Sequence, residues 1–353
     1  MYCPLHILYF IKYSISVLIL EDSLVDYIFL SREVPLSLSI LRFIKENNFP
    51  YTEILRFSEN QFKSFLQSLK DNYKIQIKNI EKKISNFNTK NNKNTFDRIE
   101  KEIEICKQNS INCLSYFNNN YPQLLKRIKL PPKLVFIKGS IQLHDEKAVA
   151  IIGTRNPTPY GAEMAKQIAK RLSKLGFTII SGFARGIDTI AIKSALDNGG
   201  RAIGIIASGI LNLYPKENET LVKRLVSNGA LISERFPSRS VTKNALQIRN
   251  RITSGLALGN IFVEGNRFSG SKWQLRYGKE QGRISIAVKP IGDYEQAHVP
   301  NLVINQERGP VISDIDDVDY IAEILMNELA ERKNLISEKD RIISKQTNLF
   351  KFG

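Results

Sequence analysis

The stretch AVAIIGTRNPTPYGAEMAKQIAKRLSKLGFTIISGFARG, residues 148–186, decides the fold of this chain. Residues 148–152 are a fully apolar run broken by a glycine, which is typical of a buried parallel strand. Apolar residues three or four apart over 159–172 then predict a helix. Residues 177–180 predict a second buried strand, and a second glycine turn leads into a helix from Ile187. A strand–turn–helix unit therefore occurs twice in succession.

Each of the two turns contains glycine and arginine. The turns read Gly153-Thr154-Arg155 and Ser181-Gly182-Phe183-Ala184-Arg185-Gly186. Glycine lets backbone N–H groups approach a ligand, the next helix N-terminus attracts anions, and a guanidinium matches phosphate oxygens. Because the carboxyl ends of parallel strands meet at one edge of a sheet, the turns predict a phosphate site there. The spacing is not GxGxxG, so an ordinary dinucleotide fingerprint is not supported, and glycines that merely turn the chain are the alternative.

Strands and helices continue to alternate up to about residue 290. Further strands are predicted at 202–206, 230–233, 261–263 and 284–288, after a short one at 134–137. Six strands separated by crossover helices predict an α/β fold with a doubly wound, mostly parallel, Rossmann-like sheet. The expected domains are a helical N-terminal region at 1–70, a basic helical linker at 71–110, an extended Rossmann-like domain at 111–315, and a C-terminal helix and tail at 316–353.

Composition favours a polyanionic partner. The 353 residues include 51 Lys and Arg against 35 Asp and Glu, which gives a net charge of +16. Nucleic acid is the natural partner for such a chain, although an AT-rich genome also enriches lysine. The three cysteines have no metal-ligand spacing and fit a reducing cytoplasm, and the scattered histidines support neither a zinc site nor a Ser-His-Asp triad.

The apolar run at residues 5–20 invites a membrane interpretation. It is too short to span a bilayer, contains Lys12 and lacks a small-residue cleavage site. A packed helix, or a start codon placed too early, explains the run better than a membrane anchor. We therefore expect a cytoplasmic protein without a membrane partner.

Two later clusters extend the predicted phosphate site. Arg249-Asn250-Arg251 lies near the start of a predicted helix, and Ser269-Gly270-Ser271-Lys272 opens the helix after the strand at 261–263. Both should reach the same sheet edge as the two turns. The candidate acids are Asp188, Glu217, Glu234 and Glu264, and neither histidine nor cysteine accompanies them. A cationic pocket without an acid–base pair indicates binding rather than turnover, and no cofactor is expected.

The runs IIGTRNPTPYG, SGFARGIDTIAIKSAL, GGRAIGIIASGILNLYPKENETL, GALISE, RNRITSGLA, VEG, SGS and EQGR together resemble the DNA-processing protein A (DprA/Smf) family. The resemblance covers about residues 110–313. It implies an extended Rossmann domain that binds and protects single-stranded DNA and delivers it to a RecA-type recombinase, often as a homodimer, in DNA uptake (transformation), recombination or repair. It brings no established catalytic reaction. The family's phosphate-binding positions fall on Gly153, Thr154, Arg155, Ser181, Gly182, Arg185, Gly186, Arg249, Asn250, Arg251, Ser269, Gly270 and Ser271.

The chain departs from the family pattern at two places. Leu246-Gln247-Ile248 stands where the family has Phe-Pro before its Arg-Asn-Arg, which alters a wall of the expected pocket. Lys272-Trp273-Gln274 replaces Leu-Ile-Thr after Ser-Gly-Ser. Trp273 either stacks a nucleic-acid base or packs as an ordinary core residue of its helix.

The C-terminal tail carries a second resemblance. Gln346, Leu349, Phe350 and Phe352 are similar to a sliding-clamp-binding peptide, in which a short segment inserts apolar anchors into a preformed pocket. The alternative is a tail that packs on its own domain.

Two other function classes remain open at this stage. One is a nucleotide-processing Rossmann enzyme, although the chain lacks the PGGxGTxxE pattern that such enzymes carry. The other is a sensor that binds a small nucleotide in the same pocket. Competition between free nucleotide and DNA separates the sensor from a DNA-binding protein.

Overall fold

The computed structural model describes the backbone of residues 23–349 and the side chains of residues 23–334. The apolar run at 5–20 lies outside these residues. The chain divides into two units after Asn109. Each unit has a hydrophobic interior of its own.

The first unit is helical. Its elements are α2 (Leu24–Ile28), the π-helical turn η1 (Phe29–Glu33), α3 (Leu38–Glu46), α4 (Tyr51–Leu55), α5 (Glu59–Asp71), α6 (Ile80–Lys90) and α7 (Lys93–Gln108). Aromatic rings hold these helices together, because Phe62 stacks on Phe87 at 4.1 Å and Phe29 stacks on Phe96 at 4.9 Å. We expected a linker over 71–110, but α6 and α7 pack into this unit through Phe87 and Phe96.

The second unit is built on one sheet. Within the described residues its strands are β1 (Ile111–Ser115), β2 (Leu134–Gly139), β3 (Ala148–Ile152), β4 (Thr178–Ser181), β5 (Ala202–Ile206), β6 (Gly229–Ser233), β7 (Gly259–Phe262), β8 (Ile284–Val288) and β9 (Val311–Ile312). They lie in the order β1-β2-β6-β5-β4-β3-β7-β8-β9. The pairs β1–β2 and β2–β6 are antiparallel, and the remaining pairs are parallel.

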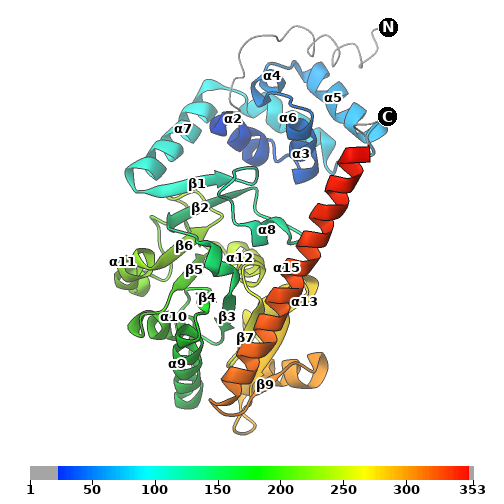
Figure 1. Ribbon diagram of the computed structural model, residues 1–353. Helices are drawn as coiled ribbons and strands as arrows, with labels where there is room; N and C mark the ends of the chain where they lie inside the picture. The colour runs from blue at the N-terminus through cyan, green and yellow to red at the C-terminus, as the bar shows by residue number, and fades with distance from the viewer. Residues whose placement is uncertain (1–22, 350–353) are drawn as a thin grey trace. The chain divides into compact units, whose positions relative to one another are not determined.

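Helices connect the parallel strands (Figure 1). They are α9 (Pro159–Lys174), α10 (Ile187–Asp197), α11 (Glu219–Ser227), α12 (Lys243–Gly255), α13 (Ser271–Glu280) and α14 (His298–Leu302). The short helix α8 (Gln123–Lys126) connects the antiparallel strands β1 and β2, and α15 (Asp317–Leu349) follows β9. Short helical turns complete the chain: η2 (Leu143–Glu146), η3 (Lys216–Asn218), η4 (Glu295–Ala297) and η5 (Val303–Glu307). The strand order runs outward from β3 in one direction through β4 to β6 and in the other through β7 to β9, so right-handed crossovers put helices on both faces. The predicted α/β, doubly wound, mostly parallel sheet is confirmed.

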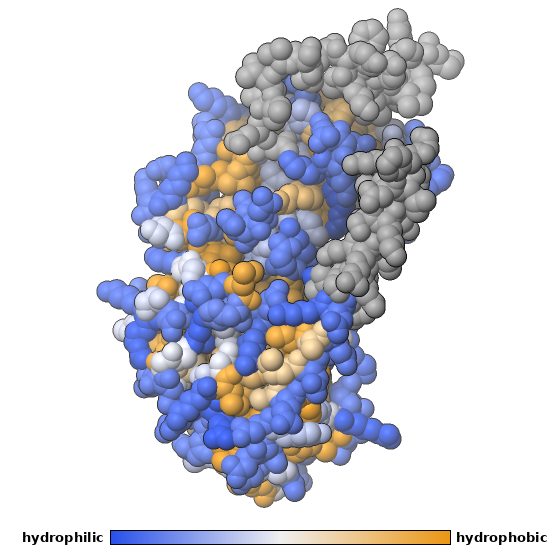
Figure 2. Space-filling model, in the orientation of Figure 1, coloured by the Kyte–Doolittle hydropathy of each residue, from blue (hydrophilic) through white to orange (hydrophobic). Residues whose placement is uncertain are grey.

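Buried apolar runs explain why these strands form the centre of the sheet. Residues 148–152 and 202–206 are buried along their whole length, as parallel strands covered on both faces must be. The expected C-terminal helix is α15, which extends to Leu349. No helix within residues 23–349 is long and apolar enough to cross a membrane. The face of the molecule in Figure 2 is largely hydrophilic, with apolar residues in small groups.

Candidate phosphate-binding site

The two glycine–arginine turns follow neighbouring strands, β3 and β4, and contact each other. The backbone N–H of Ile187 donates to the carbonyl oxygen of Thr154 over 3.2 Å. Gly186 has a φ of 74°, and a Cβ atom there would lie 2.6 Å from the carbonyl oxygen of Arg155 and closer still to that of Thr154. Glycine is needed at this point both for its backbone conformation and for the close approach. The two turns therefore form one continuous surface at the carboxyl edge of the sheet.

Arg249 of α12 is buried against the second turn. A Cβ atom on Gly182 would lie 2.7 Å from Arg249 Cζ and 2.5 Å from Asp188 Oδ2, so this glycine makes room for both groups. Arg249 Nη1 donates to the carbonyl oxygen of Ile205 at 2.6 Å, while Nε has no partner among the described residues. Burial lowers the pKa of Arg249, and nearby Arg155 acts in the same direction, whereas Asp188 opposes it. A buried cation with free donors is costly unless an anion meets it.

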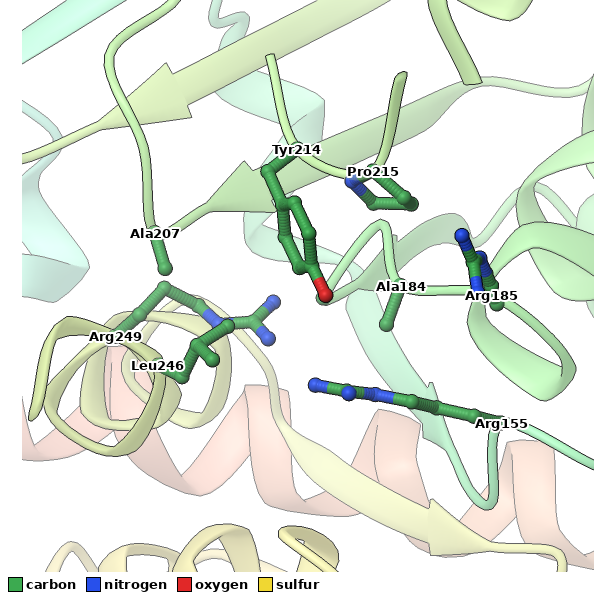
Figure 3. Close-up of a pocket in the computed structure, with 9 residues that line it drawn as sticks. Arg155, Ala184, Arg185, Ala207, Tyr214, Pro215, Leu246 and Arg249 are labelled. Carbon is green, nitrogen blue, oxygen red and sulfur yellow. The ribbon is translucent and has the colours of Figure 1, made fainter. Parts of the chain in front are cut away.

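A small pocket, partly open to solvent, lies over these groups. Its lining comprises Arg155, Gly182, Ala184, Arg185, Ala207, Tyr214, Pro215, Leu246 and Arg249. The guanidinium groups of Arg155 and Arg249 point into the same space (Figure 3). Arg155 is exposed, and no acidic side chain within residues 23–334 pairs with it. Two guanidinium groups thus converge on a space whose lining contains no carboxylate, while Asp188 lies behind Arg249 against Gly182.

The other predicted residues of the two turns differ in whether they line the pocket or make structural contacts. Arg185 lines the pocket and forms an exposed ion pair with Glu217. Ser181 is buried, and its hydroxyl donates to a carbonyl oxygen of β3 at 2.6 Å. Gly153 and Thr154 do not line the pocket and contribute backbone to the contact between the turns.

Arg251 and Asn250 do not line the pocket; they connect α12 to neighbouring loops by hydrogen bonds. Arg251 Nε donates to the carbonyl oxygen of Leu130 at 2.7 Å, and its Nη2 pairs with Glu234 at 2.7 Å. Asn250 Nδ2 donates to the carbonyl oxygen of Gly270 at 3.2 Å. These contacts fasten α12 to three loops that are distant in sequence, which fixes the position of Arg249 between them.

The Ser269-Gly270-Ser271 turn lies beside α12 through the Asn250 contact, outside the pocket lining. The hydroxyl oxygens of Ser269 and Ser271 are 2.6 Å apart, and the backbone N–H of Ser271 donates to Ser269 Oγ at 3.2 Å. Lys272 is exposed in the first turn of α13. Trp273 is half-buried, and the guanidinium of Arg276 lies 5.6 Å from its ring centroid.

The candidate acids all have structural contacts. Glu264 is buried and accepts hydrogen bonds from Thr158 N, Thr158 Oγ1 and Tyr294 Oη at 2.9, 2.6 and 3.1 Å. It therefore fixes the start of α9, where a carboxylate is favourable. Burial raises the pKa of Asp188, and the backbone N–H of Ala184 approaches its Oδ2 at 3.4 Å. Glu217 and Glu234 are paired with arginines, as described above.

Some predicted residues cannot be placed in a site. Gln346 and Leu349 belong to the backbone of α15, beyond the last described side chain, and Phe350 and Phe352 lie outside the described residues. Within the described part of the chain, no group of three or more His, Cys, Asp or Glu side chains is arranged to hold a metal ion.

Sequence reasoning did not identify Tyr214 and Ala207 as pocket residues. Both follow β5, the third strand whose carboxyl end reaches this edge. The rule that ligands bind beyond the carboxyl ends of parallel strands would have pointed to the segment after β5. Leu246, which was noted as a departure from the family pattern, does form part of the pocket wall.

The sheet order, the two contacting turns and the two converging guanidinium groups define a class, namely Rossmann-like α/β proteins with a cationic pocket at the carboxyl edge of the sheet. The family model described as DNA recombination-mediator protein A matches residues 112–322, from β1 into α15. The chain belongs to this family, which confirms the DprA/Smf resemblance.

Several relatives show the extent of the similarity. The chain is 35% identical over 194 residues to DNA processing protein DprA of Bacillus subtilis (strain 168), which covers 55% of this chain and 65% of that protein. It is 28% identical over 265 residues to protein Smf of Synechocystis sp., and the match covers 74% of this chain and 66% of that protein. The chain thus spans slightly less than two thirds of the length of these curated relatives.

Solved structures of relatives share the fold. The structure of DprA from Streptococcus pneumoniae is 24% identical and superposes with a TM-score of 0.67, covering 83% of this chain and 96% of that one. A structure of DNA processing protein A from Helicobacter pylori, described in terms of its single-stranded DNA binding mode, is 26% identical with a TM-score of 0.55. The match covers 60% of this chain and 96% of that one.

Proposed function

We propose that this protein binds single-stranded DNA by inserting backbone phosphate between Arg155 and Arg249. The observation that carries the proposal is the convergence of these guanidinium groups on one open pocket whose lining contains no carboxylate. Guanidinium donors match phosphate oxygens, and a partly buried pair gains more from a phosphate than exposed lysines would. Family membership supports DNA as the polyanion, as does the single-stranded DNA binding described for the Helicobacter pylori relative.

We further propose that binding protects the strand and delivers it to a RecA-type recombinase during DNA uptake, recombination or repair. Cytoplasmic location, a homodimeric state and a clamp contact through the C-terminal tail belong to the same proposal, since they rest on the family and motif resemblances. The pocket acts by binding without chemical turnover. This part is supported by the engagement of Glu217, Glu234 and Glu264 in ion pairs or helix capping.

The test is a salt titration of oligonucleotide binding by fluorescence anisotropy, with single-stranded and duplex probes. Arg155→Ala removes one charge-assisted phosphate contact and should weaken single-strand binding roughly 10- to 150-fold. The slope of log affinity against log salt should fall by about 0.7, the value for one phosphate on a single strand.

Arg224→Ala is the matched control. Arg224 is a half-exposed arginine that pairs with Asp197, and it lies on α11 away from the pocket lining. Equal affinity losses in the two variants would reject the pocket and leave only the general attraction of the +16 charge. Displacement of DNA by a free nucleotide at low concentration would instead favour the sensor function.

A further inference from the structure

A second group of arginines lies at the amino edge of the sheet, the edge opposite the pocket. Arg283 directly precedes β8, Arg332 lies on α15, and Arg127 follows α8. The helices α8, α12 and α15 meet at this edge (Figure 1), because α8 packs on Gly255 at the end of α12 and Arg332 donates to the carbonyl oxygen of Leu258, just before β7. We call the three arginines the amino-edge arginine cluster.

A turn that terminates α13 places Arg283 in this cluster. The residue ends the run EQGR, residues 280–283, which does not line the phosphate pocket. Gly282 has a φ of 64° and ends α13 in the left-handed conformation. The backbone N–H of Arg283 then donates to the carbonyl oxygen of Gly278 at 2.8 Å. The backbone from which Arg283 extends is therefore fixed by the end of its own helix.

Two guanidinium groups of the cluster keep enclosed donors without acceptors. Arg283 Nη2 donates to the carbonyl oxygen of Gly255 at 2.8 Å, while its Nε has no partner among the described residues. Arg332 Nη2 donates to the carbonyl oxygen of Leu258 at 3.3 Å and its Nε pairs with Glu328, while its Nη1 has no partner among the same residues. Enclosed donors of this kind are unfavourable unless an acceptor meets them.

The cluster also has an excess of positive charge. Burial lowers the pKa of Arg283 to about 9. Arg332 and Arg127 lower this pKa in the same direction, against the opposing carboxylate of Glu328. Guanidinium groups that disfavour each other's charge are stabilised by an anion between them.

The simpler role of these arginines is to cap the end of α12. The last carbonyl oxygens of a helix carry partial negative charge and attract cations. One guanidinium is sufficient for that role, and Arg283 already meets the carbonyl oxygen of Gly255. Capping explains neither the additional positive charges nor the enclosed donors. Arg127 is exposed, so the cluster reaches the surface on its side.

We propose that the amino-edge arginine cluster binds a phosphate-type oxoanion, which supplies the acceptor oxygens that its guanidinium groups lack. Guanidinium donors match the oxygens of a phosphate group in geometry and charge. This inference goes beyond the proposed function, because the cluster lies at the opposite edge of the sheet and does not depend on the pocket. The oxoanion is either a backbone phosphate of a bound strand or a free phosphate, and both present the same oxygens.

The test is a titration with inorganic phosphate at constant ionic strength, followed by the midpoint of thermal unfolding. All phosphate titrations use the Arg155→Ala protein, so that the pocket at the carboxyl edge contributes less. A bound anion raises the midpoint along a curve that saturates, whereas the general salting effect of phosphate rises without saturation. The Arg155→Ala protein should show the saturating curve, and a rise without saturation would overturn the proposal.

Two variants of the cluster are added to the Arg155→Ala protein. Arg127→Ala should weaken phosphate binding by about tenfold or more, the loss of one charge-assisted hydrogen bond, and should remain folded because Arg127 is exposed. Arg332→Gln keeps a donor for Leu258 but removes an enclosed charge, and it should abolish the saturating curve.

Arg56→Ala is the matched control, since Arg56 is an exposed arginine of the helical unit, and it should leave the curve unchanged. If Arg127→Ala and Arg332→Gln both retain the curve of the Arg155→Ala protein, the amino-edge site is rejected. If Arg332→Gln does not fold, the result for Arg127→Ala decides.

Salt titrations of single-stranded DNA binding, with no change at Arg155, distinguish the two sources of the oxoanion. If a backbone phosphate occupies the cluster, Arg127→Ala should lower the slope of log affinity against log salt by about 0.7, and Arg56→Ala should not. If a free phosphate occupies it, Arg127→Ala leaves the DNA slope unchanged while phosphate binding is lost. The carboxyl-edge pocket is judged separately by Arg155→Ala in the DNA titration, so the failure of either site can be recognised without the other.

Discussion

The contact between the two glycine turns can be tested by comparing two glycines with nearly the same φ. Gly186 and Gly199 have φ values of 74° and 73°. A Cβ atom on Gly199 would meet nothing within 4 Å, whereas one on Gly186 would meet the backbone of the first turn. The positive φ costs an alanine about 1–2 kcal/mol at Gly199 and about 1–3 kcal/mol at Gly186, whose ψ of −130° lies outside the left-handed helical region. Overpacking against backbone adds about 1–3 kcal/mol at Gly186 alone.

We therefore expect Gly199→Ala to lower the free energy of unfolding by about 1–2 kcal/mol and Gly186→Ala to lower it by about 2–6 kcal/mol. Urea denaturation followed by tryptophan fluorescence is the assay. Trp273 is the single tryptophan of the chain and lies on α13, so the signal reports the unit that contains both glycines. Gly186→Ala should also weaken DNA binding, because relief of the collision moves the turn that carries Arg155.

Equal losses of stability in the two variants would refute this reasoning. They would mean that the first turn moves aside at no cost and that the close contact at Gly186 does not define the pocket. Unchanged DNA affinity in a destabilised Gly186→Ala protein would separate stability from function and would remove the turn contact from the binding site.

Two further predictions concern charges near the pocket. Glu217→Gln removes the carboxylate that competes for Arg185, so single-stranded DNA should bind up to about fivefold more tightly in an anisotropy titration, whereas Asp197→Asn, the same change at an ion pair outside the pocket lining, should have no effect. Arg251→Met removes the buried arginine that pairs with Glu234 and should lower the free energy of unfolding by about 2–4 kcal/mol in urea denaturation. If the variant is as stable as the wild-type protein, the ion pair is dispensable.

The parallel strands could be predicted because their signal is local. Residues 148–152 and 202–206 are apolar without interruption, and burial on both faces demands that composition. The strand β1 at Ile111–Ser115 escaped detection because it is an edge strand with mostly half-exposed residues. We expected Arg249 near the start of its helix, but α12 begins six residues earlier at Lys243, since Thr242 caps it by accepting a hydrogen bond from Ala245 N.

The residues of the candidate site that belong to short sequence motifs could be predicted, whereas those placed by contacts distant in sequence could not. Gly182 and Arg155 stand in short motifs whose chemistry can be read directly. By contrast, Arg251 donates to a carbonyl oxygen 121 residues away in sequence. The sequence therefore could not show that Arg251 has a structural role while Arg249, two positions earlier, lines the pocket. Tyr214 has no local pattern at all, because its position depends on hydrogen bonds to loops after β4 and β6.

Under the proposed mode of DNA binding, the unequal exposure of the two pocket arginines gives them different kinetic roles. Arg155 is exposed, so its field would reach an approaching strand through water and raise the rate of association, together with the net charge of +16. Arg249 is buried and would act after a phosphate has lost its hydration, so it would govern mainly the rate of dissociation. We therefore expect physiological salt to slow capture of the strand far more than it shortens the lifetime of the bound state.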